Sequence, residues 1–368
     1  MGRGPQIQPV VIRGPRPKVG GVWVTWREAM QAALYGPDGF YSRGEPPARH
    51  FRTSVHVSPS YAGAVLELLR QVDAALGTPE RLDLVDVGAD RAELLQQALA
   101  AAATEPGRGL AGRGLAGRIA ACAVEVTPRP TGLDPRIRWQ PEPPGGITGL
   151  VIANEWLDNI PLDVVELTAT GPAVVQVDPA TGAERALGPP APEDLAWIRA
   201  WWPLRACGER AEVGSTRCAA WAGVIRNIDR GIAVAVDYGH VKADRPACGT
   251  LTGYLEGRAV PAVPDGTRDI TAHVALDACA ATGTAAGAAR AVLITQRAAL
   301  RELGLDARRP PLALAARDPA GYARALCEAS QDAELMDAAG LGGFGWLIQA
   351  VGVPMPGPLA RLGPADPR

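Results

Sequence analysis

The sequence lacks the features that mark several large classes of protein. Its 368 residues contain no run of eighteen apolar residues, so we expect no membrane span. Lysine occurs only at Lys18 and Lys242, and the formal net charge is −2. This charge balance gives no electrostatic argument for binding nucleic acid or an anionic membrane, and we expect no nucleic-acid partner.

Paired cysteines and the common catalytic motifs are also missing. The six cysteines form no CxxC pair, and their spacing shows no zinc or disulfide framework. Scattered thiols fit a reducing compartment, so we expect a cytoplasmic location. The GxSxG, Walker and HExxH motifs do not occur, which removes the markers of the common hydrolases and NTPases.

The composition is that of a globular protein, with 47% hydrophobic and 21% charged residues. The length allows one elaborated domain or two. Residues 1–22 are basic and rich in Pro and Gly, which indicates a flexible arm, although a transit peptide has similar charge. Residues 104–118 hold the repeat GRGLAGRGLAGR, which predicts a mobile insert.

Buried-strand runs alternate with amphipathic segments along the chain. The clearest example is Leu82–Leu95, in which the apolar run 82–87 is followed by a turn at Gly88 and a helix from residue 92. The further predicted strands are 119–126, 149–153, 164–167, 173–177, 231–236, 291–295 and 344–350, and the further predicted helices are 25–34, 59–76, 193–202, 209–228, 297–303 and 319–329. This alternation predicts an α/β fold with a mainly parallel sheet.

Polar groups follow four of the predicted strands. They are Gly88–Arg91, Glu125, Asn154–Asp158 and Asp237–His240. Ligands of open parallel sheets bind outside the carboxyl ends of the strands, so this shared position is informative. Glu125 could accept hydrogen bonds from two ribose hydroxyls, or it could be a solvated acid at a strand end.

Two acids and two histidines are candidates for chemistry. Glu155 and Asp158 are three residues apart, and on a helical turn they would face the same side. Paired carboxylates can hold guanidinium or ammonium or act as a general base, but they could equally cap a helix that buries Trp156. His240 and His273 could be catalytic, although a structural histidine with a hydrogen bond is commoner.

Several short motifs follow one another in an order that can be compared with a known family. The motifs are residues 33–37, 39–42, Phe51–Ser54 with Ser58, Asp86–Ala89, Ile152–Pro161, Asp237–His240, Gly249–Leu251, Asp269–Val274, Thr295–Gln296 and Leu335–Asp337. In this order the chain resembles the MidA-type S-adenosylmethionine-dependent methyltransferases, from about Trp26 to Leu347. These include the mitochondrial complex I assembly factor that methylates an arginine of a partner subunit.

The resemblance implies a class I methyltransferase-like Rossmann sheet, with helices on both faces and S-adenosyl-L-methionine as cofactor. It implies a protein substrate, with arginine guanidinium as the methyl acceptor, and it leaves a homodimer open. The implied cofactor-binding residues are Thr53, Ser54, Gly88, Ala89, Asp90, Glu125 and Asn154, and the implied catalytic residues are Glu155, Asp158 and His240. No metal is implied.

The same resemblance implies a division of the chain. A helical region at residues 23–80 would cover the cofactor, and the methyltransferase-like domain would occupy residues 81–368. An insertion around residues 165–225 would lie on the substrate side.

The glycine turn departs from the family pattern, which usually reads glycine-x-glycine-x-glycine. Here Asp90 and Ala92 replace the last two glycines, and His56 stands where relatives commonly carry a glutamate. A left-handed Ala92 would cost about 1–2 kcal/mol. The charge of Asp90, at ~4 Å from a cofactor carboxylate, would cost about 1–4 kcal/mol depending on solvation.

These departures keep two alternatives open. The first is a degenerate member of the family that keeps the fold as a binding or assembly module. The second is a nicotinamide-dependent oxidoreductase, because Gly88 and Glu125 alone do not distinguish the two cofactors.

Overall fold

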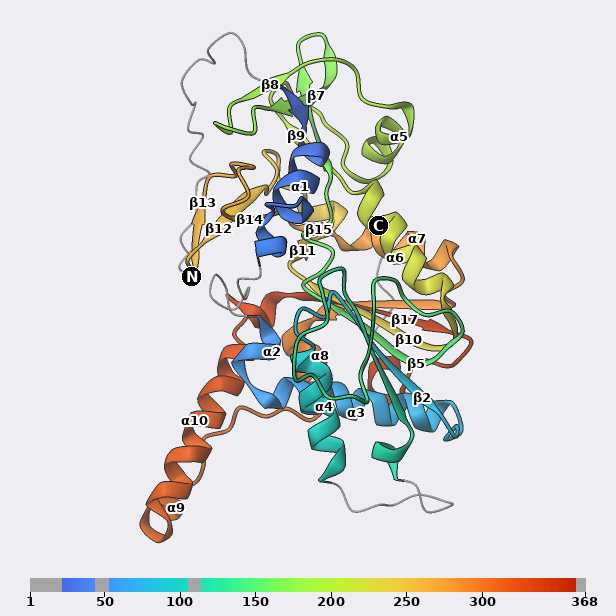
Figure 1. Cartoon of the computed structure of the whole chain (residues 1–368), viewed down its shortest axis with the longest axis vertical. Coiled ribbons are helices and arrows are strands. Elements are labelled where there is room, and N and C mark those ends of the chain that lie inside the picture. Colours follow the sequence, from blue (N-terminus) through green and yellow to red (C-terminus); the bar gives the residue numbers. More distant parts are fainter. Residues whose placement is uncertain (1–21, 44–52, 105–113, 362–368) are drawn as a thin grey trace. The chain divides into compact units, whose positions relative to one another are not determined.

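The computed structural model describes residues 22–43, 53–104 and 114–361 (Figure 1). The predicted arm up to residue 21, Phe51 and Arg52 of the early motif, and most of the predicted insert lie outside these ranges. The chain forms two compact units. The small unit contains residues 22–43, 161–215 and 244–272, and the sheet unit contains the remaining described residues. The predicted division at residue 80 stays a prediction.

The sheet unit is built on a seven-stranded sheet in the order β16-β17-β10-β5-β2-β3-β4. Its strands are β2 (Leu82–Val87), β3 (Ile119–Val124), β4 (Arg138–Gln140), β5 (Ile147–Asn154), β10 (Ile228–Asp237), β16 (Arg290–Thr295) and β17 (Gly345–Val351). Neighbours from β10 to β4 pair in parallel, whereas β17 is antiparallel to both β10 and β16. The α/β fold and the mainly parallel sheet are therefore confirmed.

Helices cover both faces of this sheet, as the alternation predicts. On one face the indole of Trp346 donates to Gln296 of α8 (Gln296–Glu302) at 3.2 Å, and the same apolar core includes α3 (Pro59–Ala75) and α4 (Glu93–Ala103). On the other face Gln349 accepts from the indole of Trp221 on α6 (Ser215–Arg226) at 2.7 Å. Gln349 also donates to Ala280 of α7 (Leu276–Ala285) at 3.1 Å.

The small unit contains two antiparallel sheets. The first has the order β1-β7-β6-β9 with β8 paired to β7, and the second has the order β13-β12-β14. The elements are β1 (Val24–Thr25), α1 (Trp26–Tyr35), β6 (Asp163–Thr168), β7 (Gly171–Val177), β8 (Glu184–Ala186), α5 (Pro192–Trp201), β9 (Arg210–Val213), β12 (Thr252–Leu255), β13 (Arg258–Val260) and β14 (Asp269–Thr271). Helix α1 begins with the predicted capping box of Thr25 and Glu28.

Shorter elements complete the described fold. They are α2 (Ser54–Val57), β11 (Gly239–His240), β15 (Val274–Ala275), α9 (Leu312–Arg317), α10 (Pro319–Leu335), α11 (Gly357–Ala360) and 3-10 turns at Phe40–Arg43, Leu115–Gly117, Lys242–Asp244 and Leu341–Gly343. In the described part of the chain, no helix is long and apolar enough to cross a membrane.

The predicted helix over residues 209–228 is wrong in its first half. Residues 210–213 form β9, which pairs with β6 in register from Asp163↔Val213 to Glu166↔Arg210. The helix begins only at Ser215, after Gly214, where a Cβ would lie 2.7 Å from the Trp197 ring. Pairing with a distant strand thus overrides the local helical pattern.

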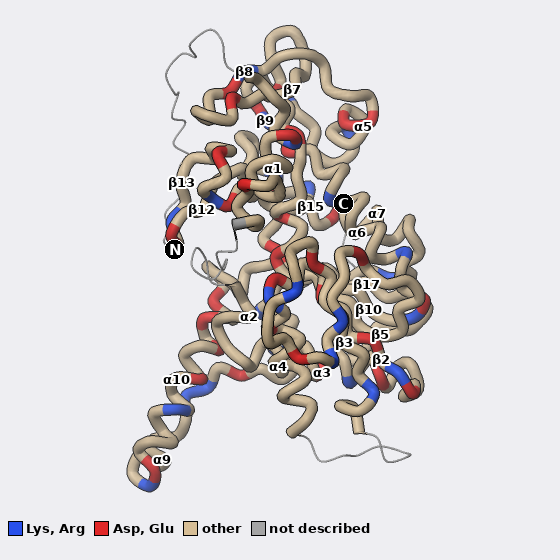
Figure 2. The backbone as a smooth tube through the Cα atoms, in the orientation of Figure 1, with Lys and Arg blue, Asp and Glu red and all other residues tan. Residues whose placement is uncertain are grey.

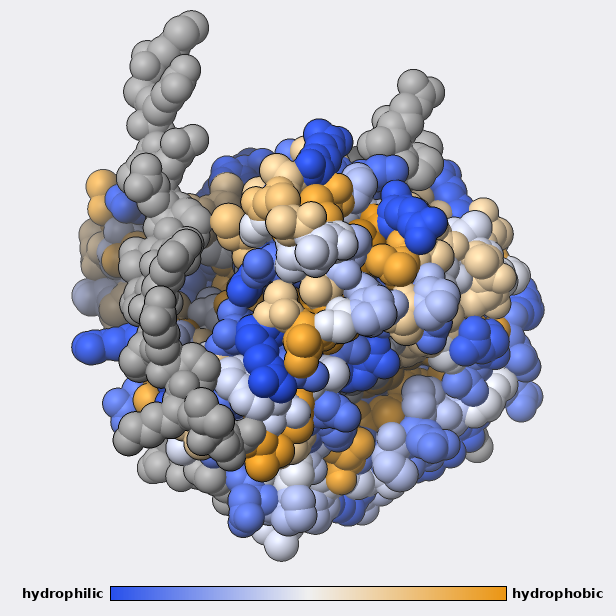
Figure 3. Space-filling model, turned by 90° about the horizontal axis from the view of Figure 1, so that it is seen from above, coloured by the Kyte–Doolittle hydropathy of each residue, from blue (hydrophilic) through white to orange (hydrophobic). Residues whose placement is uncertain are grey.

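The surface has mixed character. Acidic and basic residues are interspersed along the described chain (Figure 2). The large hydrophobic side chains that are exposed stand singly, at Val22, Val126, Leu187, Leu312 and Leu326. The face drawn in Figure 3 accordingly shows small apolar patches interrupted by hydrophilic residues.

We expect Gly283→Ala to lower the free energy of unfolding by about 1–3 kcal/mol, the cost of breaking a buried hydrogen bond. A Cβ on Gly283, in α7, would collide with the amide of Gln349, which is fully buried and bonded to Trp221. Urea unfolding measures the change.

The matched control is Gly63→Ala in α3, where a Cβ meets nothing within 4 Å. This change should raise stability by about 0.5–1 kcal/mol, because alanine favours a helix over glycine. Equal stability of the two variants would contradict the proposed packing of Gln349.

Candidate active site

All of the predicted site residues lie in the sheet unit, most of them just beyond the carboxyl ends of strands. The parallel register sets Val87 beside Val124 of β3 and Ala153 of β5, and it sets Asn154 beside Val236 of β10. The ends of β2, β3, β5 and β10 therefore share one edge of the sheet. Thr53 and Ser54 reach the same place from α2.

The turn after β2 requires glycine at its first position. Gly88 has φ +73°, and a Cβ there would lie 2.7 Å from Cδ1 of Trp156. Its N–H donates to the carbonyl of Val124 at 3.0 Å. Glycine is needed here because the Trp156 ring fills the space that a side chain would occupy.

The rest of the turn adopts the left-handed backbone even though the glycines are missing. Asp90 has φ +45° and Ala92 has φ +59°. The strain expected for Ala92 is therefore present, at about 1–2 kcal/mol. Its methyl group is fully buried, which offsets about 0.8 kcal/mol of that strain. The turn thus has the shape of a glycine-rich loop without its composition.

Glu125 is tied to this turn. Its Oε2 accepts from the N–H of Asp90 at 3.2 Å, and its Oε1 accepts from the N–H of Thr127 at 3.0 Å. Each carboxylate oxygen has a second lone pair, so Glu125 can still accept a hydroxyl donor.

Several carboxyl groups around the turn repel one another. Burial, with Glu93 and Glu125 nearby, raises the pKa of Asp86 to about 8 and that of Asp90 to about 6. Burial also raises the pKa of Glu155 to about 7. The shifts mark a site in which acidic groups outnumber cationic ones, and a cationic ligand would relieve them.

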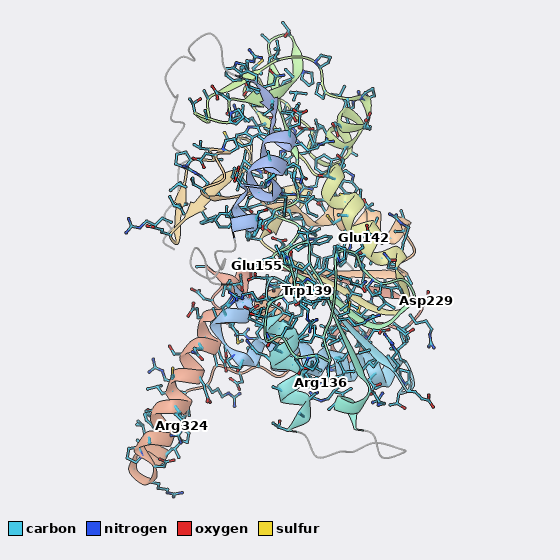
Figure 4. The ribbon with its side chains drawn as sticks, in the orientation of Figure 1. Arg136, Trp139, Glu142, Glu155, Asp229 and Arg324 are labelled. Atoms are coloured by element: carbon cyan, nitrogen blue, oxygen red, sulfur yellow. The ribbon has the colours of Figure 1, made fainter. Side chains whose placement is uncertain are left out.

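Glu155 (labelled in Figure 4) joins α2 to β5. Its Oε1 accepts from the N–H of Ser54 at 3.2 Å and from Nδ2 of Asn154 at 3.0 Å. The hydroxyl of Tyr61 in turn donates to Asn154 Oδ1 at 2.6 Å. Glu155 has φ +51°, a strained backbone of the kind that clusters at functional sites.

The helical turn expected at Glu155 and Asp158 is wrong. Residues 155–160 form bends and a turn, because the N–H groups of Leu157 and Asp158 donate to Asp237 Oδ2 at 3.0 and 3.2 Å. The two acids nevertheless interact, since the charge of Asp158 helps raise the pKa of Glu155. The alternative, in which the two acids cap a helix that buries Trp156, is also wrong. The Trp156 ring is partly exposed and lies over Gly88.

Asp158 is buried, and its Oδ2 accepts a hydrogen bond from the hydroxyl of Tyr238. The fully buried guanidinium of Arg217 clamps this region by donating to the carbonyls of Asp158, Ile160 and His273. Burial raises the pKa of Asp237 well above its usual range. These contacts give the segment after β5 a single conformation.

His240 lies near another histidine. It belongs to β11, which pairs with β15, and its ring centroid lies 6.3 Å from that of His273. The ring of Tyr238 lies 5.1 Å from the His273 ring. The described contacts thus join His240 to Tyr238 and Asp158 rather than to the glycine turn.

Thr53 and Ser54 are occupied by contacts within the unit. The hydroxyl of Ser54 donates to Gln296 Oε1 at 3.2 Å, and Thr53 Oγ1 lies 2.7 Å from Nδ1 of His56. Together with the bond from Ser54 N–H to Glu155, these contacts hold α2 against the strand ends.

Sequence reasoning missed Arg217, Tyr61 and Gln296 as supports of the site. Each is a helical residue whose partner is distant in sequence, so no local pattern marks it. Tyr238 could have been found, because it lies within the segment Asp237–His240 that follows a strand.

A surface pocket of about 1000 Å³ lies elsewhere in the sheet unit, between α8 and the end of α10. Arg297, Arg301 and Arg308 line it together with Asp306, Glu334 and Asp337. None of the predicted site residues borders it, and its charges are mixed.

The sheet unit thus brings a glycine turn and several buried acids to one edge of a mainly parallel sheet. The family described as "Putative S-adenosyl-L-methionine-dependent methyltransferase" matches residues 62–294, more than half of the chain. The chain belongs to this family and is an S-adenosylmethionine-dependent methyltransferase. The predicted kinship, enzyme class and cofactor are therefore confirmed.

Two crystal structures from Burkholderia thailandensis resemble the whole chain. One is described as a "likely methyl transferase" and holds bound S-adenosyl-homocysteine; it is 25% identical, with a TM-score of 0.75. The other is a native structure of an uncharacterised protein, also 25% identical, with a TM-score of 0.74. Each comparison covers 94% of this chain and 92% of the other. No protein of curated function matches the sequence.

The stability of the ligand-free protein should fall as pH rises from about 5 to 8. The folded state keeps protons on Asp90, Glu155 and Asp86, whose pKa values are about 6, 7 and 8, whereas the unfolded chain has already lost them. The slope approaches about 1.4 kcal/mol per pH unit for each group that is titrating in this sense. Urea unfolding across this range measures it.

Asp86→Asn removes one of these groups and should flatten the slope. Stability that is constant or rises over this pH range would contradict the account of the buried acids.

Proposed function

We propose that the enzyme methylates a protein side chain, with arginine guanidinium as acceptor, and that it holds its cofactor in the class I arrangement. The strand order, with β17 as the one reversed strand, supports that arrangement. The single observation that carries the cofactor placement is the turn at Gly88, which is left-handed and linked to Glu125 through Asp90.

The residues present fit S-adenosylmethionine. When bound, this cofactor supplies a methyl group on a sulfonium centre, which is already a good leaving group. Glu125 keeps lone pairs for ribose hydroxyls, and the partly exposed ring of Trp156 lies over Gly88 at the same turn. The acids Asp86, Asp90 and Glu155 offer negative charge to the sulfonium and the ammonium.

Glu155 and Asp158 support arginine as the acceptor. Two carboxylates can hold the planar guanidinium and orient one nitrogen. Glu155 Oε1 is held by Ser54 and Asn154, which leaves Oε2 for the substrate. With a pKa of about 7, Glu155 suits a group that binds a cation and then takes up its proton.

Asp158 and His240 would act through their neighbours. Tyr238 donates to Asp158 and stacks edge-on against His273, so the hydroxyl is held near the acid pair. Orientation of the acceptor and exclusion of water would supply most of the rate enhancement.

Binding of S-adenosylmethionine near pH 7 should release protons, because a cation favours the ionised forms of Asp86 and Glu155. S-adenosylhomocysteine has lost the sulfonium charge and should release fewer. Calorimetry in buffers of different ionisation enthalpy measures both. Equal release by the two ligands would contradict a sulfonium placed beside these acids.

The acceptor is tested with methyl-labelled S-adenosylmethionine and two peptides that differ only in arginine or lysine at the central position. Label should enter the arginine peptide. Glu155→Gln should lower turnover by about 100-fold, the usual contribution of an acid–base group, while S-adenosylhomocysteine still binds. Glu67→Gln, a change on the surface of α3, is the control and should retain turnover.

Label on the lysine peptide, with none on the arginine peptide, would contradict the proposed acceptor. Loss of S-adenosylhomocysteine binding in Glu155→Gln would assign Glu155 to the cofactor instead.

A further inference from the structure

A histidine faces the acidic turn of the cofactor site. His56, on α2, has Nε2 at 3.8 Å from Glu93 Oε1 and Nδ1 at 2.7 Å from Thr53 Oγ1. A ring nitrogen of His56 and one carboxylate oxygen each of Asp90 and Glu93 all lie within 4.8 Å of one another. The Thr53 hydroxyl orients the ring, and Nε2 is the nitrogen that faces the acids.

The charges around His56 favour its protonated form. Glu93 of α4, Asp90 of the turn and Glu155 beyond β5 raise the pKa of His56, with Glu93 as the main cause, against the effect of burial. From α10, the carboxylate of Asp332 accepts a hydrogen bond from Ser58, which follows α2. The other cation near Asp90 is Arg91, whose side chain is exposed.

We propose that the His56 imidazolium neutralises Asp90 and provides the cation that the carboxylate of the cofactor's aminoacyl end faces. This inference rests on the cofactor placement proposed above. Without this cation Asp90 would repel that carboxylate, because the turn carries an acid where the family pattern has a glycine. Nε2 of His56 also lies 3.8 Å from Glu93, so one cation faces two acids here, and the departures from the family pattern at His56 and Asp90 compensate each other in part.

If His56 faces the aminoacyl carboxylate, its substitution should affect only ligands that carry this carboxylate. S-adenosylhomocysteine carries the aminoacyl carboxylate, whereas 5′-methylthioadenosine has the same adenosine and thioether but no aminoacyl group. His56→Gln should weaken binding of S-adenosylhomocysteine by about 10- to 100-fold, the range of a charge-assisted hydrogen bond. Binding of 5′-methylthioadenosine should change by less than about twofold, because that ligand carries no carboxylate for His56 to face.

A double-mutant cycle tests the pairing with Asp90. Asp90→Asn keeps the size of the side chain and tolerates the left-handed backbone. In the His56→Gln background it should restore the part of the affinity for S-adenosylhomocysteine that His56 contributes by neutralising Asp90, but not the part from its direct contact with the carboxylate. Arg324→Gln removes an exposed cation on α10 and is the control, with an expected change of less than about twofold because solvent screens it.

Wild-type protein provides a second test that needs no variant. From pH 6 to 8 the affinity for S-adenosylhomocysteine should fall, as His56 loses its proton and Asp90 becomes fully ionised. The affinity for 5′-methylthioadenosine should stay nearly constant. In Asp90→Asn the pH dependence should become weaker without vanishing, because His56, Asp86 and Glu155 still titrate.

The failure of this inference is distinguishable from the failure of the cofactor placement. If Gly88→Ala leaves the binding of both ligands unchanged, the cofactor lies elsewhere and both ideas fail. If Gly88→Ala weakens both ligands while His56→Gln affects the two equally, the placement survives and the role of His56 is wrong. A pH-independent affinity of wild-type protein for S-adenosylhomocysteine would also overturn that role.

Discussion

Parallel pairing of β2 with β3 and β5 is the constraint on which the site depends. It aligns Val87 with Val124 and Ala153, so that Gly88, Glu125 and Asn154 leave the sheet at one edge. A slip of one residue would turn every side chain of β2 to the opposite face of the sheet. Because all six residues of β2 are buried, such a slip is strongly disfavoured, and the positions of the polar groups beyond it follow.

The site concentrates negative charge at a cost to the ligand-free fold. Asp86, Asp90 and Glu155 all have raised pKa values, and Glu155 and Ala92 also hold strained backbone. Neighbouring contacts, such as those of Tyr61 with Asn154 and of Arg217 with three carbonyls, hold the strained segments in place. This is the pattern expected where binding a cationic cofactor matters more than stability.

The sequence was sufficient for the parts of the fold that are determined locally. The strand at 82–87, the helices α1 and α3 and the glycine turn all carry short-range signals, and they were predicted nearly to the residue. The strand at 210–213 was missed because its pairing with β6 is a long-range contact. The helical turn expected after Asn154 was wrong because Asp237, which is distant in sequence, accepts hydrogen bonds from the N–H groups of Leu157 and Asp158.

The candidate site divides in the same way. Residues that follow strands could be named in advance, whereas Arg217 and the pairing of His56 with Asp90 and Glu93 depend on the folded arrangement. The departures at Asp90 and Ala92 were visible in the sequence, but their consequence was not. The turn keeps its shape, and His56 stands opposite the added acid.

A crystal structure of this protein with S-adenosylhomocysteine tests the central claim most directly. The account predicts the ribose hydroxyls on Glu125 and the aminoacyl end beside the turn from Gly88 to Ala92, facing His56. A ligand bound away from this turn, or a ribose that makes no contact with Glu125, would contradict it.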